Sequence, residues 1–166
     1  MTSFTWWFKA TSFCRSKRIP VSVCSPKTFH STLKAHDSKN HPHISFTGYH
    51  QYCGNGLRLA SFDGTVWATN VIESGGNKGC DSALLIDSND NAYIAYQDRD
   101  QSKLKFTTNK SGSWIAYAPE TGGYNIAYPG YYSSLVMDDQ GKFHIAHYDS
   151  HNDDLHYSTG VPNGAW

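Results

Sequence analysis

Glutamate is almost missing from this chain of 166 residues. Of its 14 acidic side chains only two are glutamates, Glu73 and Glu120, and the other twelve are aspartates. Glutamate favours helices whereas aspartate favours turns, so this imbalance argues against a helical protein and predicts turn-rich β structure. Eleven Tyr, eight Phe and five Trp indicate the same class, because aromatic side chains pack well on strands.

The chain also lacks a net charge and a long apolar run. Its 14 basic residues balance its 14 acidic ones, so it has no electrostatic footprint for nucleic acid. No apolar stretch approaches the ~20 residues needed to cross a bilayer, so no transmembrane segment is predicted. Near the N-terminus the apolar ThrTrpTrpPhe precedes the basic residues, the reverse of a secretory signal, so no compartment is assigned from it.

Cysteine is scarce and its spacing matches no metal site. Cys14, Cys24, Cys53 and Cys80 are interpreted as isolated, semi-buried thiols. A disulfide such as Cys14–Cys24 is the alternative in an oxidising compartment.

From residue 29 onward a period of about 50 residues organises the chain. Asp37, Asp87 and Asp138 stand in register, 50 and then 51 residues apart. In each copy an Ile follows this Asp by seven residues, a Leu opens a later segment and a Trp closes the copy: Ile44, Ile94, Ile145, Leu57, Leu104, Leu155, Trp67, Trp114 and Trp166. A period of this length filled with short strands is typical of β-propeller blades, each too small to bury its own face.

The fold class predicted is therefore all-β, with propeller-type repeats. We expect three four-stranded antiparallel blades at about 29–73, 79–120 and 131–166, with the third blade lacking its outer strand. Residues 1–28 carry no repeat and form an irregular segment, with a candidate closing strand at 19–23. Three blades make only a partial ring, because closed propellers have ~4–8.

Two repeat segments carry a resemblance to a known family. AspAspGlnGlyLysPheHisIleAlaHis at 138–147, with LeuHisTyrSerThr at 155–159, is similar to repeats of the sialidase-like (BNR or Asp-box) β-propeller superfamily, especially its non-catalytic repeat proteins. SerPheAspGlyThrValTrp at 61–67 resembles the Asp box itself. The similarity covers about residues 30–166.

This resemblance implies structural roles for Asp63 and the closing tryptophans, because the Asp box braces a turn and its Trp packs between sheets. The repeated turn residues Asp37, Asp87 and Asp138 are predicted to be structural too, and Trp114 is expected to hold the second and third blades together. The family also indicates an extracellular or cell-surface location.

A sialidase-like glycoside hydrolase is the enzymatic alternative. LysArgIlePro at 17–20 resembles the motif whose Arg binds the substrate carboxylate, which makes Arg18 and Arg58 the catalytic candidates. Both glutamates fall in or after outer strands, and no acid–base pair lies on matching inner strands, so a non-enzymatic module is preferred.

No cofactor or metal site is predicted. His43 and His144 occupy the repeat position that Tyr93 fills in the middle copy, which argues against a conserved ligand role within the repeats. A loosely bound calcium ion at Asp87 and Asn89 stays as an alternative.

A binding or scaffold function is the main prediction. Aromatic rings beside carboxylates suit glycans or protein loops. The predicted ligand-binding residues are His43, Tyr93, Tyr96, His144, Tyr148, Asp98 and Asp149. The expected partners are a second copy that completes the ring, or the rest of a longer protein. A truncated propeller fragment without a role of its own is the third alternative.

Overall fold

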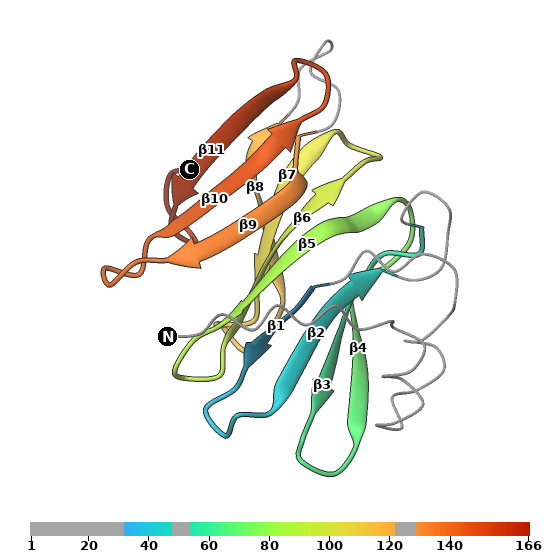
Figure 1. The fold of residues 1–166 in the computed structure, drawn as a ribbon, viewed down its shortest axis with the longest axis vertical. Coiled ribbons are helices and arrows are strands. Elements are labelled where there is room, and N and C mark those ends of the chain that lie inside the picture. The colour runs from blue at the N-terminus through green and yellow to red at the C-terminus, as the bar shows by residue number, and fades with distance from the viewer. Residues whose placement is uncertain (1–31, 48–53, 122–128) are drawn as a thin grey trace, which may run out of the picture.

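The computed structural model describes residues 32–47, 54–121 and 129–166, and all their regular structure is β-strand (Figure 1). No helix of the described residues is long and apolar enough to cross a membrane. The irregular segment 1–28, the candidate strand at 19–23 and Arg18 lie outside the described residues.

Within the described residues, eleven strands form three antiparallel sheets in chain order. Sheet 1 contains β1 (Thr32–His36), β2 (Pro42–Thr47), β3 (Leu57–Phe62) and β4 (Trp67–Glu73). Sheet 2 contains β5 (Lys78–Ile86), β6 (Ala92–Asp98), β7 (Lys103–Thr108) and β8 (Ile115–Thr121). Sheet 3 contains β9 (Tyr131–Met137), β10 (Phe143–Asp149) and β11 (Asp154–Gly160). The predicted all-β class is confirmed, with sheets of four, four and three strands.

The repeated aspartate shapes the turn between the first two strands of every sheet. Asp37 Oδ1 accepts the N–H groups of Lys39 and His41 at 3.0 and 2.7 Å. Asp87 and Asp138 each accept the N–H groups two and four residues later, at 2.9 Å. The turn also needs a positive φ at its fourth residue, which asparagine, aspartate and glycine tolerate better than most: Asn40, Asp90 and Gly141. The aspartates that recur every 50 or 51 residues are therefore explained by the equivalent turn that each of them forms.

Apolar side chains from one face of each sheet pack against the next sheet. Leu57 and Leu59 of sheet 1 lie in one buried cluster with Leu84 and Ile94 of sheet 2. A second cluster joins sheets 2 and 3, and contains Leu104, Phe106, Phe143 and Ile145. Sheet 2 is covered on both faces, so β6 is buried at every position, whereas β10 of sheet 3 alternates between buried and half-buried.

The closing tryptophans differ from what the sequence led us to expect. Trp114 packs against the cluster between sheets 1 and 2, so the prediction that it holds the second and third repeats together is wrong. Trp166 has that place instead, with its ring 4.9 Å from the ring of Phe106. Both tryptophans therefore pack at the junction between the sheet of their own repeat and the preceding sheet.

Cys80 lies in β5, which begins at Lys78. Its side chain is buried and disulfide-bonded, so the interpretation of the cysteines as isolated thiols is wrong for Cys80. Cys14, Cys24 and Cys53 lie outside the described residues.

The aromatic cluster between sheets 2 and 3 yields a stability prediction. Phe106 is fully buried, and its ring lies 4.8 Å from that of Phe143. Phe106→Ala should lower the free energy of unfolding by about 3–5 kcal/mol, because it leaves a cavity between two sheets. Val71, on β4 of sheet 1, is 52% exposed, so Val71→Ala is the control and should change it by less than about 0.5 kcal/mol. Equal effects of the two substitutions in chemical denaturation would contradict this packing.

Candidate functional site

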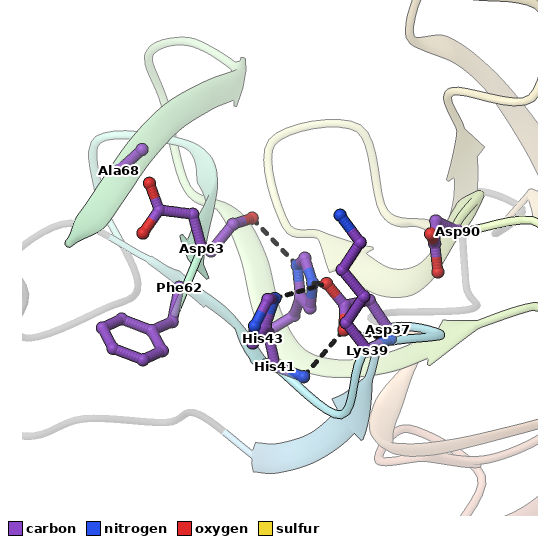
Figure 2. Close-up of a pocket in the computed structure, with 9 residues that line it drawn as sticks. Asp37, Lys39, His41, His43, Phe62, Asp63, Ala68 and Asp90 are labelled. Carbon is purple, nitrogen blue, oxygen red and sulfur yellow. Dashed lines mark hydrogen bonds and ion pairs between the residues drawn. The ribbon is translucent and has the colours of Figure 1, made fainter. Parts of the chain in front are cut away.

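An open hollow of about 280 Å³ lies beside the first turn of sheet 1 (Figure 2). Lys39 and Asp90 lie on one side of it, and Phe62, Asp63 and Ala68 lie on the other. His41 and His43 stand between these two sides, directed towards Asp37. Ser61 completes the lining.

Turns from two sheets build this hollow. Asp90 belongs to the turn between β5 and β6, and its carboxylate accepts hydrogen bonds from the backbone N–H and the hydroxyl of Ser38, at 2.6 and 2.9 Å. Asp63 accepts the N–H groups of Thr65 and Val66 at 2.7 and 2.8 Å in the turn between β3 and β4. These bonds hold the carboxylates in place around the opening.

The hollow is rich in negative charge. Hydrogen bonds from the backbone of Val66 and Thr65 lower the pKa of Asp63 below its ordinary value. Burial would raise the pKa of Asp37, but the hydrogen bonds from His41 and Lys39 outweigh it and lower that pKa too. Both carboxylates are therefore ionised at neutral pH, and Lys39 is the one lysine among the lining residues.

A row of Asp37, His43 and Ser61 has the composition of a hydrolytic triad. His43 Nδ1 lies 2.9 Å from Ser61 Oγ, and His43 Nε2 lies 3.7 Å from Asp37 Oδ2. Such a row activates a serine when the histidine acts as a general base.

In the other repeats the side chain at the position of His43 also faces the Asp of the turn. In sheet 2 the Tyr93 hydroxyl donates to Asp87 Oδ2 at 2.8 Å, and in sheet 3 His144 Nε2 lies 3.0 Å from Asp138 Oδ2. Burial and the Asp87 carboxylate raise the pKa of Tyr93 far above its ordinary value, so that side chain is no general base. The Tyr93–Asp87 hydrogen bond therefore has a structural role, and Asp37 with His43 in sheet 1 occupies the equivalent positions.

A second group of polar residues lies at the junction between sheets 1 and 2. Glu73, at the end of β4, reaches across to sheet 2, where it accepts a hydrogen bond from the Tyr96 hydroxyl. Lys105 Nζ lies 2.6 Å from Glu73 Oε1 and 3.4 Å from Asp98 Oδ2, and Lys78 Nζ lies 3.0 Å from Glu73. The ammonium of Lys105 thus sits between two carboxylates.

The junction between sheets 2 and 3 repeats this arrangement with different side chains. Glu120 of β8 contacts His147 Nε2 of β10 at 3.0 Å and His156 Nδ1 of β11 at 2.7 Å. The second ring nitrogen of His156 lies 4.0 Å from Asp149 Oδ2. His147 stands at the repeat position of Tyr96, and His156 at that of Lys105.

The pKa values at the two junctions shift for identifiable reasons. Burial would raise the pKa of Glu73, but Lys105, Tyr96 and Lys78 together lower it to about 2. Burial lowers the pKa of His147, despite the nearby Glu120. The hydrogen bond to Glu120 raises the pKa of His156.

Glu120, His147 and His156 each offer one potential ligand atom, and these atoms lie within 4.8 Å of one another. However, the buried Gly130 N–H donates to His147 Nδ1 at 3.0 Å. His147 Nε2 must then carry the proton, which it donates to Glu120. A metal-bound histidine normally donates an N–H from its other ring nitrogen, so this geometry favours a hydrogen bond over metal ligation.

The hydrogen bonds of Asp87 also argue against a calcium ion at this residue. Its carboxylate accepts hydrogen bonds from both N–H groups of the turn, from the Asn91 amide and from the Tyr93 hydroxyl. These donors occupy the lone pairs that an ion would need.

The predicted ligand-binding residues do not form one surface. Four of them are buried and bonded within the protein: Tyr93, Tyr96, Asp98 and Asp149. His43 lines the hollow in sheet 1, whereas His144 and Tyr148 lie in sheet 3. The catalytic candidate Arg58 lies in β3 and is not among the lining residues. Residue type and alternation did not reveal which face of each strand a later sheet would cover.

Sequence reasoning overlooked the role of both glutamates. Glu73 and Glu120 each follow the closing Trp of their repeat by six residues. This equal spacing was the available signal that they occupy equivalent positions.

Comparisons with known proteins identify no family. A scan against protein-family models finds no match, and no curated protein matches the chain. The resemblance of the repeats to the sialidase-like superfamily therefore stays a prediction.

The Glu73 junction makes stability depend on pH. The folded pKa of Glu73, about 2, lies below the ordinary value of about 4.3. Its contribution to stability should be complete above pH ~4.5 and disappear as the pH falls towards 2. Glu73→Gln should flatten this part of the profile in urea denaturation, whereas Asp139→Asn, at an exposed carboxylate, should preserve it. An unchanged slope in Glu73→Gln would contradict the assigned pairing.

Proposed function

We propose that this chain is a non-enzymatic binding or scaffold module whose sheets are arranged as successive propeller-type blades. Support for the arrangement comes from the equivalent packing of each sheet on the next. The first strand of sheet 2, β5, contacts the first strands of the neighbouring sheets, β1 and β9, while the outer strands β4 and β8 lie farther from this line (Figure 1). First strands side by side are what a central axis requires.

The hollow beside sheet 1 is the proposed ligand site, and its ring of fixed hydrogen-bond acceptors carries this proposal. Asp37, Asp63 and Asp90 are held by backbone or hydroxyl donors, and Phe62 adds an aromatic ring. Carboxylates beside an aromatic ring suit the hydroxyl groups and apolar faces of a sugar. A neutral glycan is therefore the preferred ligand, and a polar protein loop is the alternative.

An acidic sugar fits this hollow poorly. Sialosides carry a carboxylate, which the three aspartates of the hollow would repel. Lys39, the one lysine or arginine that lines the hollow, would attract it. The enzymatic alternative rests on Arg18, which lies outside the described residues, and on Arg58. Turnover of a fluorogenic glycoside, lost in Arg58→Ala, would overturn the non-enzymatic assignment.

Filling the hollow tests the ligand site without disturbing its turns. Ala68 lines the hollow and is exposed, so Ala68→Trp should block ligand entry while the hydrogen bonds of Asp37 and Asp63 persist. Binding to a neutral-glycan array should fall at least tenfold. Ala116→Trp places the same bulk on exposed β8 and should leave binding unchanged. Equal binding by the two variants would remove the hollow as the site.

The outer face of sheet 3 supports the proposal that the chain self-associates or is part of a longer protein. Leu155 and Tyr157 are 79% and 62% exposed, whereas their repeat equivalents in sheet 2, Leu104 and Phe106, are fully buried under the next sheet. We propose that another blade covers this face. At the other end of the row of sheets, Ile44 and Phe46 of sheet 1 are buried.

The exposed face of sheet 3 predicts association. If a second copy covers it, light scattering coupled to gel filtration should give twice the 18.5 kDa of the chain. Leu155→Lys with Tyr157→Lys should return the mass to that of one chain, because two charges cannot be buried unpaired. Lysine at exposed Val66, on sheet 1, is the control. A well-folded monomer would leave a blade of a longer protein as the occupant.

A further inference from the structure

The two sheet junctions share one geometry but differ in the chemistry of their cation. At the first, Lys105 lies between Glu73 and Asp98, at 2.6 and 3.4 Å. At the second, His156 lies between Glu120 and Asp149, at 2.7 and 4.0 Å. Lysine keeps its charge throughout the neutral range, whereas histidine loses its charge there.

We propose that the junction between sheets 2 and 3 is a pH-sensitive latch, in which protonated His156 supplies the cation that Lys105 supplies permanently at the junction between sheets 1 and 2. This inference goes beyond the proposed binding function and depends on neither the ligand nor the ring.

The contacts of the His156 ring require two protons for a favourable arrangement. Nδ1 faces Glu120 and Nε2 faces Asp149, so both nitrogens of an imidazolium would meet a carboxylate. Asp154, also on β11, adds to the negative surroundings. A neutral imidazole would instead present a lone pair to one of these acceptors.

His147 supplies the complementary half of the latch. Its Nδ1 accepts the Gly130 N–H, so its Nε2–H donates to Glu120 without a charge, as the Tyr96 hydroxyl donates to Glu73. Glu120 thus receives one neutral and one charged donor, and β8, β10 and β11 all contribute to the cluster.

The two histidines give the latch opposite pH limits. The pKa of His156 is raised in the folded chain, so its contribution is complete below the unfolded value near 6.5 and disappears as the pH rises through the folded pKa. The pKa of His147 is lowered, so its neutral form is secure above about 6.5, and stability is lost as the pH falls below that value. The junction is therefore firmest near pH ~6.5 and loosens as the pH rises from there through the folded pKa of His156.

A reciprocal exchange of the two cations tests the latch. His156→Lys should remove the loosening of sheet 3 with rising pH. Lys105→His should create such loosening at the junction of sheets 1 and 2, but a smaller one, because Lys78 Nζ still lies 3.0 Å from Glu73. His151→Lys changes an exposed histidine in the turn before β11 and is the matched control. Its pH profile should equal that of the unchanged protein.

Hydrogen exchange of the whole chain, followed by mass spectrometry from about pH 6 to pH 8.5, reports each sheet separately. After correction for intrinsic exchange, protection of β10 and β11 should fall with rising pH by about tenfold for each unit by which the folded pKa of His156 exceeds the unfolded one. Protection of β2 and β3 should stay constant. Unchanged alkaline loosening in His156→Lys would overturn the latch.

Two further measurements keep the proposal falsifiable if a variant folds poorly. An NMR titration of the unchanged protein should give His156 a pKa above 6.5, and a value at or below 6.5 would overturn the latch. Exchange measured with a chelator and then with zinc should be identical. Tightening by zinc that His156→Lys abolishes would assign the cluster to a metal and overturn the protonation mechanism.

Discussion

Face-to-face packing of small sheets is the constraint on which the rest of this structure depends. A single sheet of three or four strands cannot bury its own apolar face, so each sheet packs that face against the next sheet. Sheet 2 is covered on both sides, and its strand β6 is buried throughout. Sheet 3 is covered on one side, which leaves Leu155 and Tyr157 in the open. Whether a residue of this chain is buried thus depends on whether another sheet covers its face as much as on its residue type.

Each junction adds one carboxylate to this apolar packing. Glu73 and Glu120 project from the outer part of one sheet and meet donors on the second and third strands of the next. A partly buried carboxylate needs such partners, because burying it unpaired is costly. The contacts therefore fix the orientation of neighbouring sheets, and the choice of lysine or histidine as cation sets how that contact responds to pH.

The turns that define the repeat also form the hollow. Backbone N–H groups donate to Asp37 and Asp63, His41 Nδ1 also contacts Asp37 Oδ2, and both aspartates line the opening. Structural and binding roles are thus not alternatives for these residues. Asp37, His43 and Ser61 have the composition of a catalytic triad, but the counterpart of His43 in sheet 2 is Tyr93, which donates to the turn residue Asp87. The proposed function of recognition would use groups that the fold itself already holds in place.

Local pattern alone determined the class of this protein, its strands and its turns. The turn that each repeated Asp forms and the alternation of the second strand are local properties of a few residues, and the scarcity of glutamate argues against helices. The three antiparallel meanders could therefore be predicted from the sequence. Tertiary structure decided what lies at the junctions. Tyr93 and Tyr96 are buried because a neighbouring sheet covers each face of β6, and Trp114 packs against the cluster between sheets 1 and 2. The pairing of Glu120 with His147 and His156 joins residues 27 and 36 positions apart across two sheets. Such a contact depends on how the sheets are placed relative to one another, and the spacing of residues along a single repeat does not contain that information.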